Sequence, residues 1–174
     1  ISVYLPDVSL PDNIKISHRI DEAVAKARYV INVVPSQHVR SVFKKVVSHM
    51  PSEAIITSAS KGIEKGTLLT VSSILREVSD RPVAVLSGPS FAKEVIKRKP
   101  TAVTLATENK DMGLLLQEVF NTNHFRVYTH DDILGVELGG ALKNVMAIAS
   151  GISDGLGLGF NARAALITRG LAEM

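Results

Sequence analysis

The feature that most constrains the fold of this chain is an alternation of short apolar runs with longer amphipathic segments. The apolar runs are Tyr29–Val34, Ala54–Ser58, Val83–Leu86, Thr101–Ala106 and Phe125–Tyr128. Helical periodicity marks the segments around and between them, at Asp21–Ala27, Gln37–His49, Thr67–Val78, Phe91–Lys97 and Lys110–Asn121. Continuously apolar strands that are joined through helices indicate a parallel sheet covered on both faces. The chain is therefore expected to be an α/β protein.

The pattern changes after Thr129. The residues from Thr129 to Asp132 combine a capping residue with acidic residues, which is a helix-start signal. A helix is expected over Ile133–Ile152, then a glycine-rich turn over Asp154–Gly159, and a second helix from near Asn161. We therefore expect residues 1–129 to form a sheet domain and residues 130–174 to begin an all-helical domain.

Composition excludes several classes of function. The chain has no cysteine, which rules out disulfides, thiolate metal sites and a cysteine nucleophile. The net charge of +3 comes from scattered basic residues, so nucleic acid is not an expected partner. The five histidines show no metal-ligand spacing, and no metal site is expected. No secretory signal and no uninterrupted apolar run of membrane-spanning length are visible, so a cytoplasmic location without membrane insertion is expected.

Small or polar residues follow three successive strands. They are Pro35-Ser36-Gln37, Ser60-Lys61-Gly62 and Ser87-Gly88-Pro89-Ser90. Parallel strands place these loops on one edge of the sheet, where ligands of open α/β sheets bind. Ser90 is expected to cap the next helix, whose free N–H groups suit an anion. Ordinary turn chemistry is the better explanation of each loop alone, but with three such loops on one edge both interpretations remain open.

Lys143 is the only charged residue of Leu138–Ser153, a stretch that reads as a buried helix. Gly139 and Gly140 lie one turn before this lysine and Ala147 lies one turn after it, on the same helix face. Two adjacent glycines weaken a helix by roughly 1 kcal/mol each, so bare backbone beside the lysine suggests room for a ligand. The alternative is a lysine whose stem packs while its ammonium reaches water.

The Gly155-Leu156-Gly157-Leu158-Gly159 run resembles a dinucleotide-binding loop only superficially. That fingerprint follows a strand and opens a helix, whereas this run follows a helix, and its third glycine comes one place too early. A flexible turn between helices is the better interpretation.

Seven collinear segments resemble one family, the bacterial-type NAD(P)-dependent glycerol-3-phosphate dehydrogenases. The segments are VVPSQ (Val33–Gln37), SKGIE (Ser60–Glu64), SGPSFAKEV (Ser87–Val95), PTAV (Pro100–Val103), FRVYT (Phe125–Thr129), GVELGGALKNVMAIASGISDGLGLG (Gly135–Gly159) and NARAALITRGLAEM (Asn161–Met174). The resemblance implies a Rossmann domain followed by an all-helical domain. It also implies interconversion of sn-glycerol 3-phosphate and dihydroxyacetone phosphate with NAD or NADP, which feeds phospholipid synthesis.

The resemblance implies a role for particular residues. Lys143 corresponds to the family's proton acceptor, and Asn144 lines the same site. Lys61 is implied to contact both cofactor and substrate. Other implied substrate contacts are Gly88 and Ser90, and other implied cofactor contacts are Pro35, Ser36 and Ala92. A lysine can act as the base only if burial and a neighbouring cation lower its pKa, and Lys61 is the candidate neighbour.

Parts of the family pattern are expected to lie outside this chain. The glycine-rich dinucleotide loop with its first βαβ portion is expected upstream of Ile1, and the segment that binds the substrate phosphate is expected beyond Met174. The chain is therefore expected to be a fragment that is not a competent enzyme alone. Cofactor preference is not visible in it, and the resemblance leaves a homodimer open.

Two other functions compete with this one. A 6-phosphogluconate or 3-hydroxyacyl type of dehydrogenase also pairs a Rossmann domain with a helical domain, but the segments SGPSFA and LITRGLAEM argue against it. The other alternative is a catalytically inert nucleotide-binding scaffold. The presence of both Lys61 and Lys143 argues against the scaffold.

Overall fold

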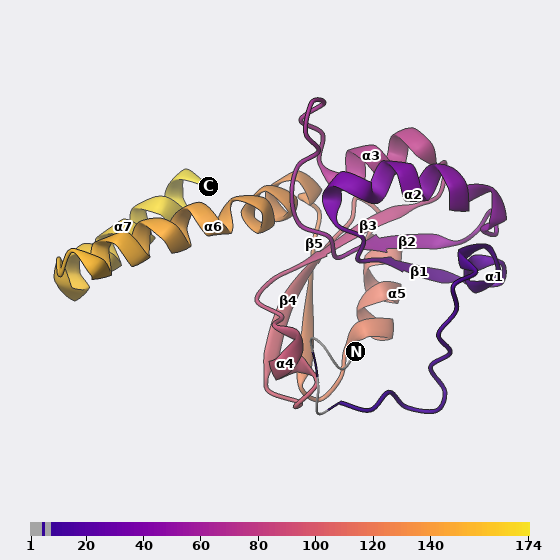
Figure 1. The fold of residues 1–174 in the computed structure, drawn as a ribbon, viewed down its shortest axis with the longest axis horizontal. Helices are drawn as coiled ribbons and strands as arrows, with labels where there is room; N and C mark the ends of the chain where they lie inside the picture. Colours follow the sequence, from indigo (N-terminus) through magenta and orange to yellow (C-terminus); the bar gives the residue numbers. More distant parts are fainter. Residues whose placement is uncertain (1–4, 6–7) are drawn as a thin grey trace.

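A computed structural model describes residue 5 and residues 8–174, and it shows a sheet-based body from which two helices project (Figure 1). The sheet has five strands in the order β1-β2-β3-β4-β5. The strands are β1 (Tyr29–Asn32), β2 (Ile55–Ser58), β3 (Val83–Ser87), β4 (Thr101–Ala106) and β5 (Phe125–His130). All five expected strands are therefore present.

Helices cover the sheet on both faces, as expected. On one face lie α2 (Val39–Val46) and α3 (Val71–Val78), and on the other lies α5 (Lys110–Phe120) (Figure 1). The remaining elements of the body are α1 (Ile20–Val24), α4 (Ala92–Val95) and the 3-10 turns η1 (Ser36–His38) and η2 (Val47–His49). The two layers of helices make this a Rossmann-like α/β fold.

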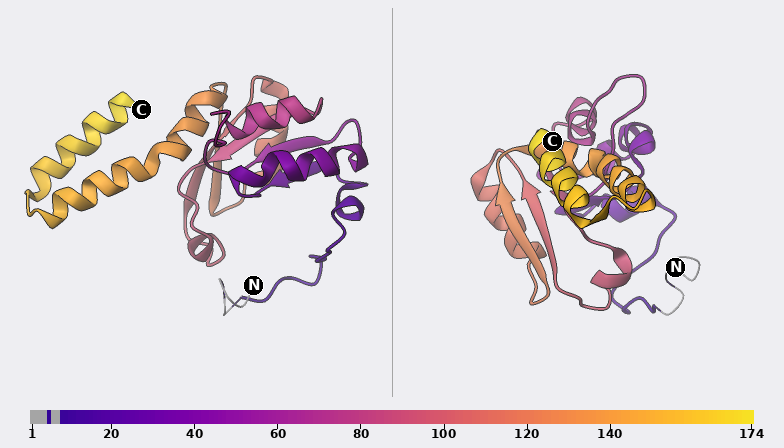
Figure 2. Two further views of the ribbon diagram at one scale, coloured as in Figure 1. Left: turned by 45° about the horizontal axis from the view of Figure 1, so that its top comes forward. Right: turned by 90° about the vertical axis from the view of Figure 1, so that its left-hand side faces the viewer.

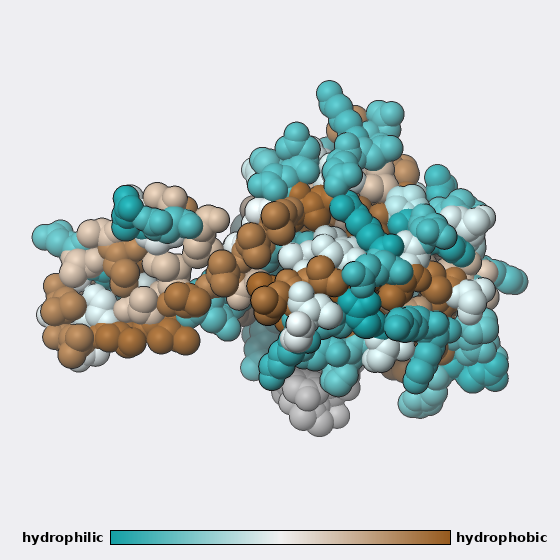
Figure 3. Space-filling model, turned by 90° about the horizontal axis from the view of Figure 1, so that it is seen from above, coloured by the Kyte–Doolittle hydropathy of each residue, from teal (hydrophilic) through white to brown (hydrophobic). Residues whose placement is uncertain are grey.

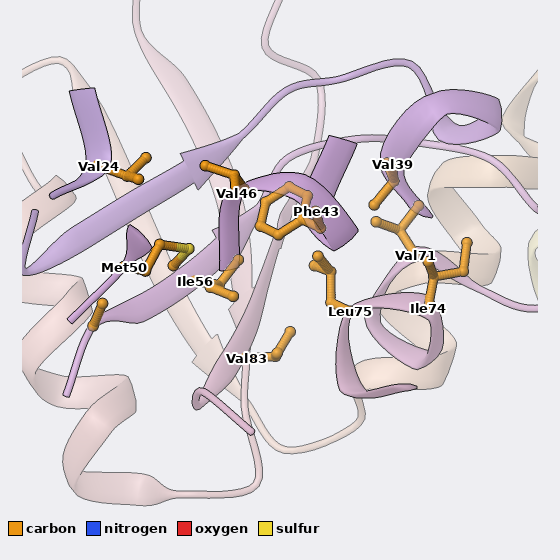
Figure 4. Packing of buried hydrophobic residues seen from close by; sticks show 11 residues of the cluster. Val24, Val39, Phe43, Val46, Met50, Ile56, Val71, Ile74, Leu75 and Val83 are labelled. Atoms are coloured by element: carbon orange, nitrogen blue, oxygen red, sulfur yellow. The ribbon is translucent and has the colours of Figure 1, made fainter. Parts of the chain in front are cut away.

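Each face of the sheet has its own hydrophobic core. The first core joins α2 and α3 to β2, with Phe43, Ile56 and Leu75 at most 3% exposed (Figure 4). The second core joins α5 to β4 and β5 through Leu105, Leu116 and Val127. Neighbouring strand residues such as Val83 and Ala84 belong to different cores, because successive side chains point to opposite faces.

The prediction of a wholly parallel sheet is wrong at one pairing. β1, β2 and β3 are mutually parallel and β4 is parallel to β5, but β4 runs antiparallel to β3. A parallel crossover usually needs a full helix that covers one face. Residues 88–100 contain only the four-residue α4, which is shorter than the expected helix over Phe91–Lys97. The chain therefore returns beside β3 in the opposite direction.

The helix expected over Thr67–Val78 begins only at Val71. The residues before it form a loop that a bridge between Ile63 and Thr70 closes. Gly66 and Leu68 adopt positive φ angles in this loop, which a helix does not allow. The loop connects β2 to α3 and carries the sequence SKGIE.

The projecting helices are α6 (Ile133–Gly155) and α7 (Gly159–Glu173) (Figures 1 and 2). Asp132 caps α6 by accepting a hydrogen bond from the Gly135 N–H, in agreement with the predicted helix start. Leu156, Gly157 and Leu158 form the turn between the two helices, so the interpretation of the glycine run as a turn is correct.

The prediction that α6 is buried is wrong. Only Ile133, Glu137 and Ser153 of α6 are buried, and apolar side chains are exposed along the projecting helices α6 and α7 (Figure 3). Beyond its first turns, α6 packs mainly against α7. By length and composition α6 could also cross a membrane. A search of the sequence for uninterrupted apolar residues did not identify α6 as long and apolar enough to cross a membrane. Glycines, Glu137 and Lys143 interrupt its apolar residues.

Candidate active site

The carboxyl ends of β1, β2 and β3 meet at one edge of the sheet, as their parallel pairing requires. The first turns of α6 pass over the end of β3 at this edge (Figure 1). A cavity of about 580 Å³ lies between them. Its lining is Lys61, Ser87, Gly88, Pro89, Ser90, Phe91, Thr104, Gly135, Val136, Gly139, Gly140 and Lys143.

Hydrogen bonds to the loop after β1 hold the Lys61 loop in place. Ser60 Oγ donates to the Val34 carbonyl at 2.6 Å, and Gln37 Nε2 donates to the Ile63 carbonyl at 2.7 Å. Gly62 has a φ of +125°, and a Cβ there would lie 2.7 Å from Ser36 Oγ. The positive φ favours glycine here, and a side chain would also displace the Ser36 hydroxyl.

An ion-pair network fixes the far side of the same loop. Arg40 of α2 binds both carboxylate oxygens of Glu64 at 2.8–3.1 Å and also pairs with Glu77 of α3 at 2.6 Å. Thr67 Oγ1 donates to Glu64 at 2.6 Å. The Arg40 guanidinium, and then the Thr67 hydroxyl, lower the pKa of the Glu64 carboxyl to about 2. The network therefore depends on an ionised Glu64.

This network predicts a pH dependence of stability. The folded pKa of Glu64 is about 2 and the ordinary value is 4.5. The stabilisation by ionised Glu64 is therefore complete above about pH 4.5 and is lost as the pH falls through about 2. We expect the urea midpoint of the wild type to exceed that of Glu64→Gln at neutral pH, and the difference to shrink in this range. When Arg40→Met is present in both proteins, most of the pH-dependent difference in urea midpoint caused by Glu64→Gln should disappear. A difference between the wild type and Glu64→Gln that stays constant with pH would contradict the network.

The Gly88 loop forms the cavity wall at the end of β3. Gly88 has a φ of +150°, and a Cβ there would lie 2.9 Å from the Val103 Cα on β4. Ser90 does not cap α4 as predicted: its hydroxyl donates to the Gly88 carbonyl at 3.4 Å, and Phe91 occupies the cap position without a side-chain bond. The Ser90 side chain is exposed at the cavity instead, because the chain is still extended at Phe91.

Small residues bring α6 close to the sheet edge. A Cβ on Gly140 would lie 2.7 Å from Ser87 Oγ and 3.6 Å from the Lys61 Cγ. One turn further along, Lys143 reaches the same cavity, and its Nζ donates to Asn144 Oδ1 at 2.7 Å. The glycine pair beside the lysine therefore provides close approach, although Ala147 is not part of the lining.

The electrostatics differ from the expectation in one respect. Lys143 is exposed, which agrees with the alternative in which its ammonium reaches water and not with a buried lysine, because few neighbouring elements cover α6. The partly buried lysine is Lys61. Its partial burial, and then the positive charge of Lys143, lower the pKa of the Lys61 ammonium below its ordinary value. The two ammonium groups therefore act on one cavity and repel each other.

The structure brings together some of the proposed site residues. Lys61, Gly88, Ser90 and Lys143 line the cavity, and Asn144 contacts Lys143. The proposed cofactor residues Pro35, Ser36 and Ala92 lie outside the cavity lining. Within residues 8–174 no group of three metal-binding side chains is found.

Sequence reasoning missed Glu137, which is 8% exposed and accepts two hydrogen bonds from Ser72. A signal existed, because a carboxylate stands between Val136 and Leu138 in an apolar helix. The Arg40–Glu64 pair was also missed. Its partners lie 24 residues apart, and no local pattern connects them.

Two family models match the chain. The one described as NAD-dependent glycerol-3-phosphate dehydrogenase N-terminus matches residues 2–113, and the one described as its C-terminus matches residues 132–174. The chain belongs to the NAD-dependent glycerol-3-phosphate dehydrogenase family. This membership agrees with the resemblance inferred from the seven segments and argues against the 6-phosphogluconate and 3-hydroxyacyl types.

Relatives within this family support the assignment. Glycerol-3-phosphate dehydrogenase (NAD(P)+) of Citrifermentans bemidjiense is 52% identical over 99% of this chain and 53% of its own length. The crystal structure of glycerol-3-phosphate dehydrogenase from Coxiella burnetii is 42% identical, with a TM-score of 0.88 over 99% of this chain and 53% of that one. The Plasmodium falciparum enzyme is 30% identical, with a TM-score of 0.91 over 99% of this chain and 49% of that one. The chain spans about half the length of these relatives.

Proposed function

We propose that this chain carries the reaction site of an NAD(P)-dependent glycerol-3-phosphate dehydrogenase, an oxidoreductase that supplies glycerol 3-phosphate for phospholipid synthesis. The observation that carries the proposal is the convergence of Lys61 and Lys143 on one cavity. These lysines come from different elements, a strand-end loop and the long helix α6. Family membership supplies the substrate class, and the printed names of the relatives support it.

The two lysines have complementary tasks in this proposal. Oxidation of a secondary alcohol releases a proton, and neutral Lys143 Nζ accepts it from the hydroxyl oxygen. In the reverse direction protonated Lys143 donates a proton to the ketone oxygen. The Lys61 ammonium attracts the anionic substrate. Asn144 orients the Lys143 amine through its 2.7 Å hydrogen bond.

We assign the cavity to the nicotinamide end of the cofactor. Gly88, Gly139 and Gly140 add no side chains to its walls, and the exposed phenyl ring of Phe91 offers a flat apolar surface. The cofactor, NAD or NADP, supplies the hydride acceptor. Pro35, Ser36 and Ala92 lie outside the cavity, and we assign them to the remainder of the dinucleotide.

The domain division, location and assembly remain part of the proposal. Residues 1–129 are assigned to the dinucleotide-binding domain and residues 130–174 to the start of the helical substrate domain, which is supported by the change from strands to helices at His130. We assign the protein to the cytoplasm, with α6 in the helical domain and not in a membrane, because its first turns pack on the sheet. The proposed partner is a small phosphorylated substrate, without nucleic acid, and a homodimer stays open as the assembly.

A spectrophotometric assay tests the proposed function. The complete protein is mixed with dihydroxyacetone phosphate and either NADH or NADPH, and the loss of absorbance is followed. Turnover with at least one cofactor is expected, and the ratio of the two rates gives the cofactor preference. Folded protein that turns over neither cofactor would contradict the proposal and favour the inert scaffold.

A further inference from the structure

Glu137 is the buried acidic side chain of α6, and it is not among the residues that line the cavity. It is 8% exposed, and its carboxylate accepts a hydrogen bond from the Ser72 N–H at 2.8 Å and another from the Ser72 Oγ at 2.5 Å. A carboxylate that loses water needs such partners, because burial without them is costly. Both partners belong to one residue, which makes the contact specific.

Ser72 lies in the first turn of α3, an eight-residue helix. Amide groups in the first turn of a helix lack partners within the helix, and the helix dipole is positive there. The Thr70 side chain at the cap position forms no capping hydrogen bond to the α3 backbone. Glu137 therefore completes the beginning of α3 from a distant part of the chain, 65 residues away.

The Glu137–Ser72 contact connects the two elements that carry the lysines. The Lys61 loop leads directly into α3, and Lys143 lies on the same helix as Glu137. Among the residues that the structure describes, no other side-chain hydrogen bond joins α6 or α7 to the part of the chain before β5. Gly140, one turn beyond Glu137, then rests against Ser87 and the Lys61 side chain.

We infer that Glu137 is a positioning residue, which acts through Ser72 to hold α6 where Lys143 and Lys61 share one cavity. The inference rests on the proposed function of that cavity. It assigns to Glu137 a role in the reaction without contact to substrate or cofactor. Removing the carboxylate lets α6 shift against α3, and displacement of a reacting group by about 1 Å costs up to about 100-fold in rate.

Glu137→Ala and Glu137→Gln in the complete protein test this inference. When kcat is measured well below the unfolding temperature of the variant, we expect Glu137→Ala to lower it by about 10- to 100-fold. The Kd for NADH should stay within about twofold of the wild-type value. Glu137→Gln should restore most of kcat, because its carboxamide can accept from the Ser72 N–H and donate to the Ser72 hydroxyl. Glu108→Ala is the matched control. It removes an exposed carboxylate that pairs with Arg76 of α3 and should leave kcat unchanged.

Two further measurements distinguish a wrong inference from a variant that does not fold and from a wrong proposed function. Hydrogen exchange of the first-turn amides of α3 should be at least about tenfold faster in Glu137→Ala, whether or not the protein turns over the proposed substrate. If Glu137→Ala does not fold, Ser72→Ala is the replacement variant, with an expected loss of kcat of about threefold and unchanged NADH binding. A wild-type kcat in Glu137→Ala, or a loss of kcat in Glu137→Gln as large as in Glu137→Ala, would overturn the inference. An inactive wild type would instead contradict the proposed function.

Discussion

Replacing Lys143 with alanine in the complete protein is expected to lower kcat by about 100-fold or more, while the Kd for NADH stays within about twofold. The variant removes the group proposed to accept the proton, and general acid–base groups contribute about 10²–10⁴-fold to rates. Lys143 is exposed, and among the described residues its one hydrogen bond goes to the neighbouring Asn144, so its loss should barely change the free energy of unfolding. The measurement is steady-state kinetics together with fluorescence titration of NADH.

The control for this prediction is Lys45→Ala. Lys45 is an exposed lysine in the last turn of α2, outside the cavity lining, and it should behave as the wild type. A Lys143→Ala protein that retains more than about a tenth of the wild-type kcat would remove Lys143 from the proton-transfer role. The same result would favour Lys61, the lysine with the lowered pKa, as the base.

The variant Gly88→Ala is expected to destabilise the protein by about 3 kcal/mol and to lower activity strongly. Its φ of +150° is unfavourable for an L-residue, which costs about 1–3 kcal/mol. The added Cβ would also lie 2.9 Å from the Val103 Cα, and overpacking against backbone costs about 1–3 kcal/mol more. To relieve the contact between the added Cβ and Val103, β3 and β4 must separate where they pair antiparallel. This separation displaces the Ser90 side of the cavity.

Gly66→Ala is the matched control, because Gly66 also has a positive φ, of +88°, but nothing lies within 4 Å of its added Cβ. The control should lose only the strain energy, about 1–2 kcal/mol, and keep its activity. The measurement is urea unfolding with an activity assay on each variant. Equal losses of stability in the two variants would show that contact with Val103 has no effect.

The sequence predicts the body of the fold well, because the apolar runs are continuous and their helices amphipathic. It fails at the β3–β4 pairing, since strand direction depends on whether residues 88–100 cover a face, and not on the strand sequences. It also fails at α6, where an apolar helix reads as buried but remains largely exposed. Apolar composition alone does not specify which partner covers a helix.

The candidate site was predicted through its loops, since parallel strands must end at one edge and α6 carries a single central lysine. That Lys61 and Lys143 share one site was implied only by the resemblance to the family, and the two residues line one cavity. The supporting contacts could not be predicted in the same way. Glu137 and Ser72 lie 65 residues apart, and Arg40 and Glu64 lie 24 apart, so only the folded chain brings them together.

A crystal structure of the complete protein with sn-glycerol 3-phosphate and oxidised cofactor tests the central claim most directly. We expect the substrate in the cavity between Lys61 and Lys143, with its C2 oxygen about 3 Å from Lys143 Nζ. A substrate bound elsewhere, with neither lysine within hydrogen-bonding distance, would contradict the claim that these two residues form the reaction site.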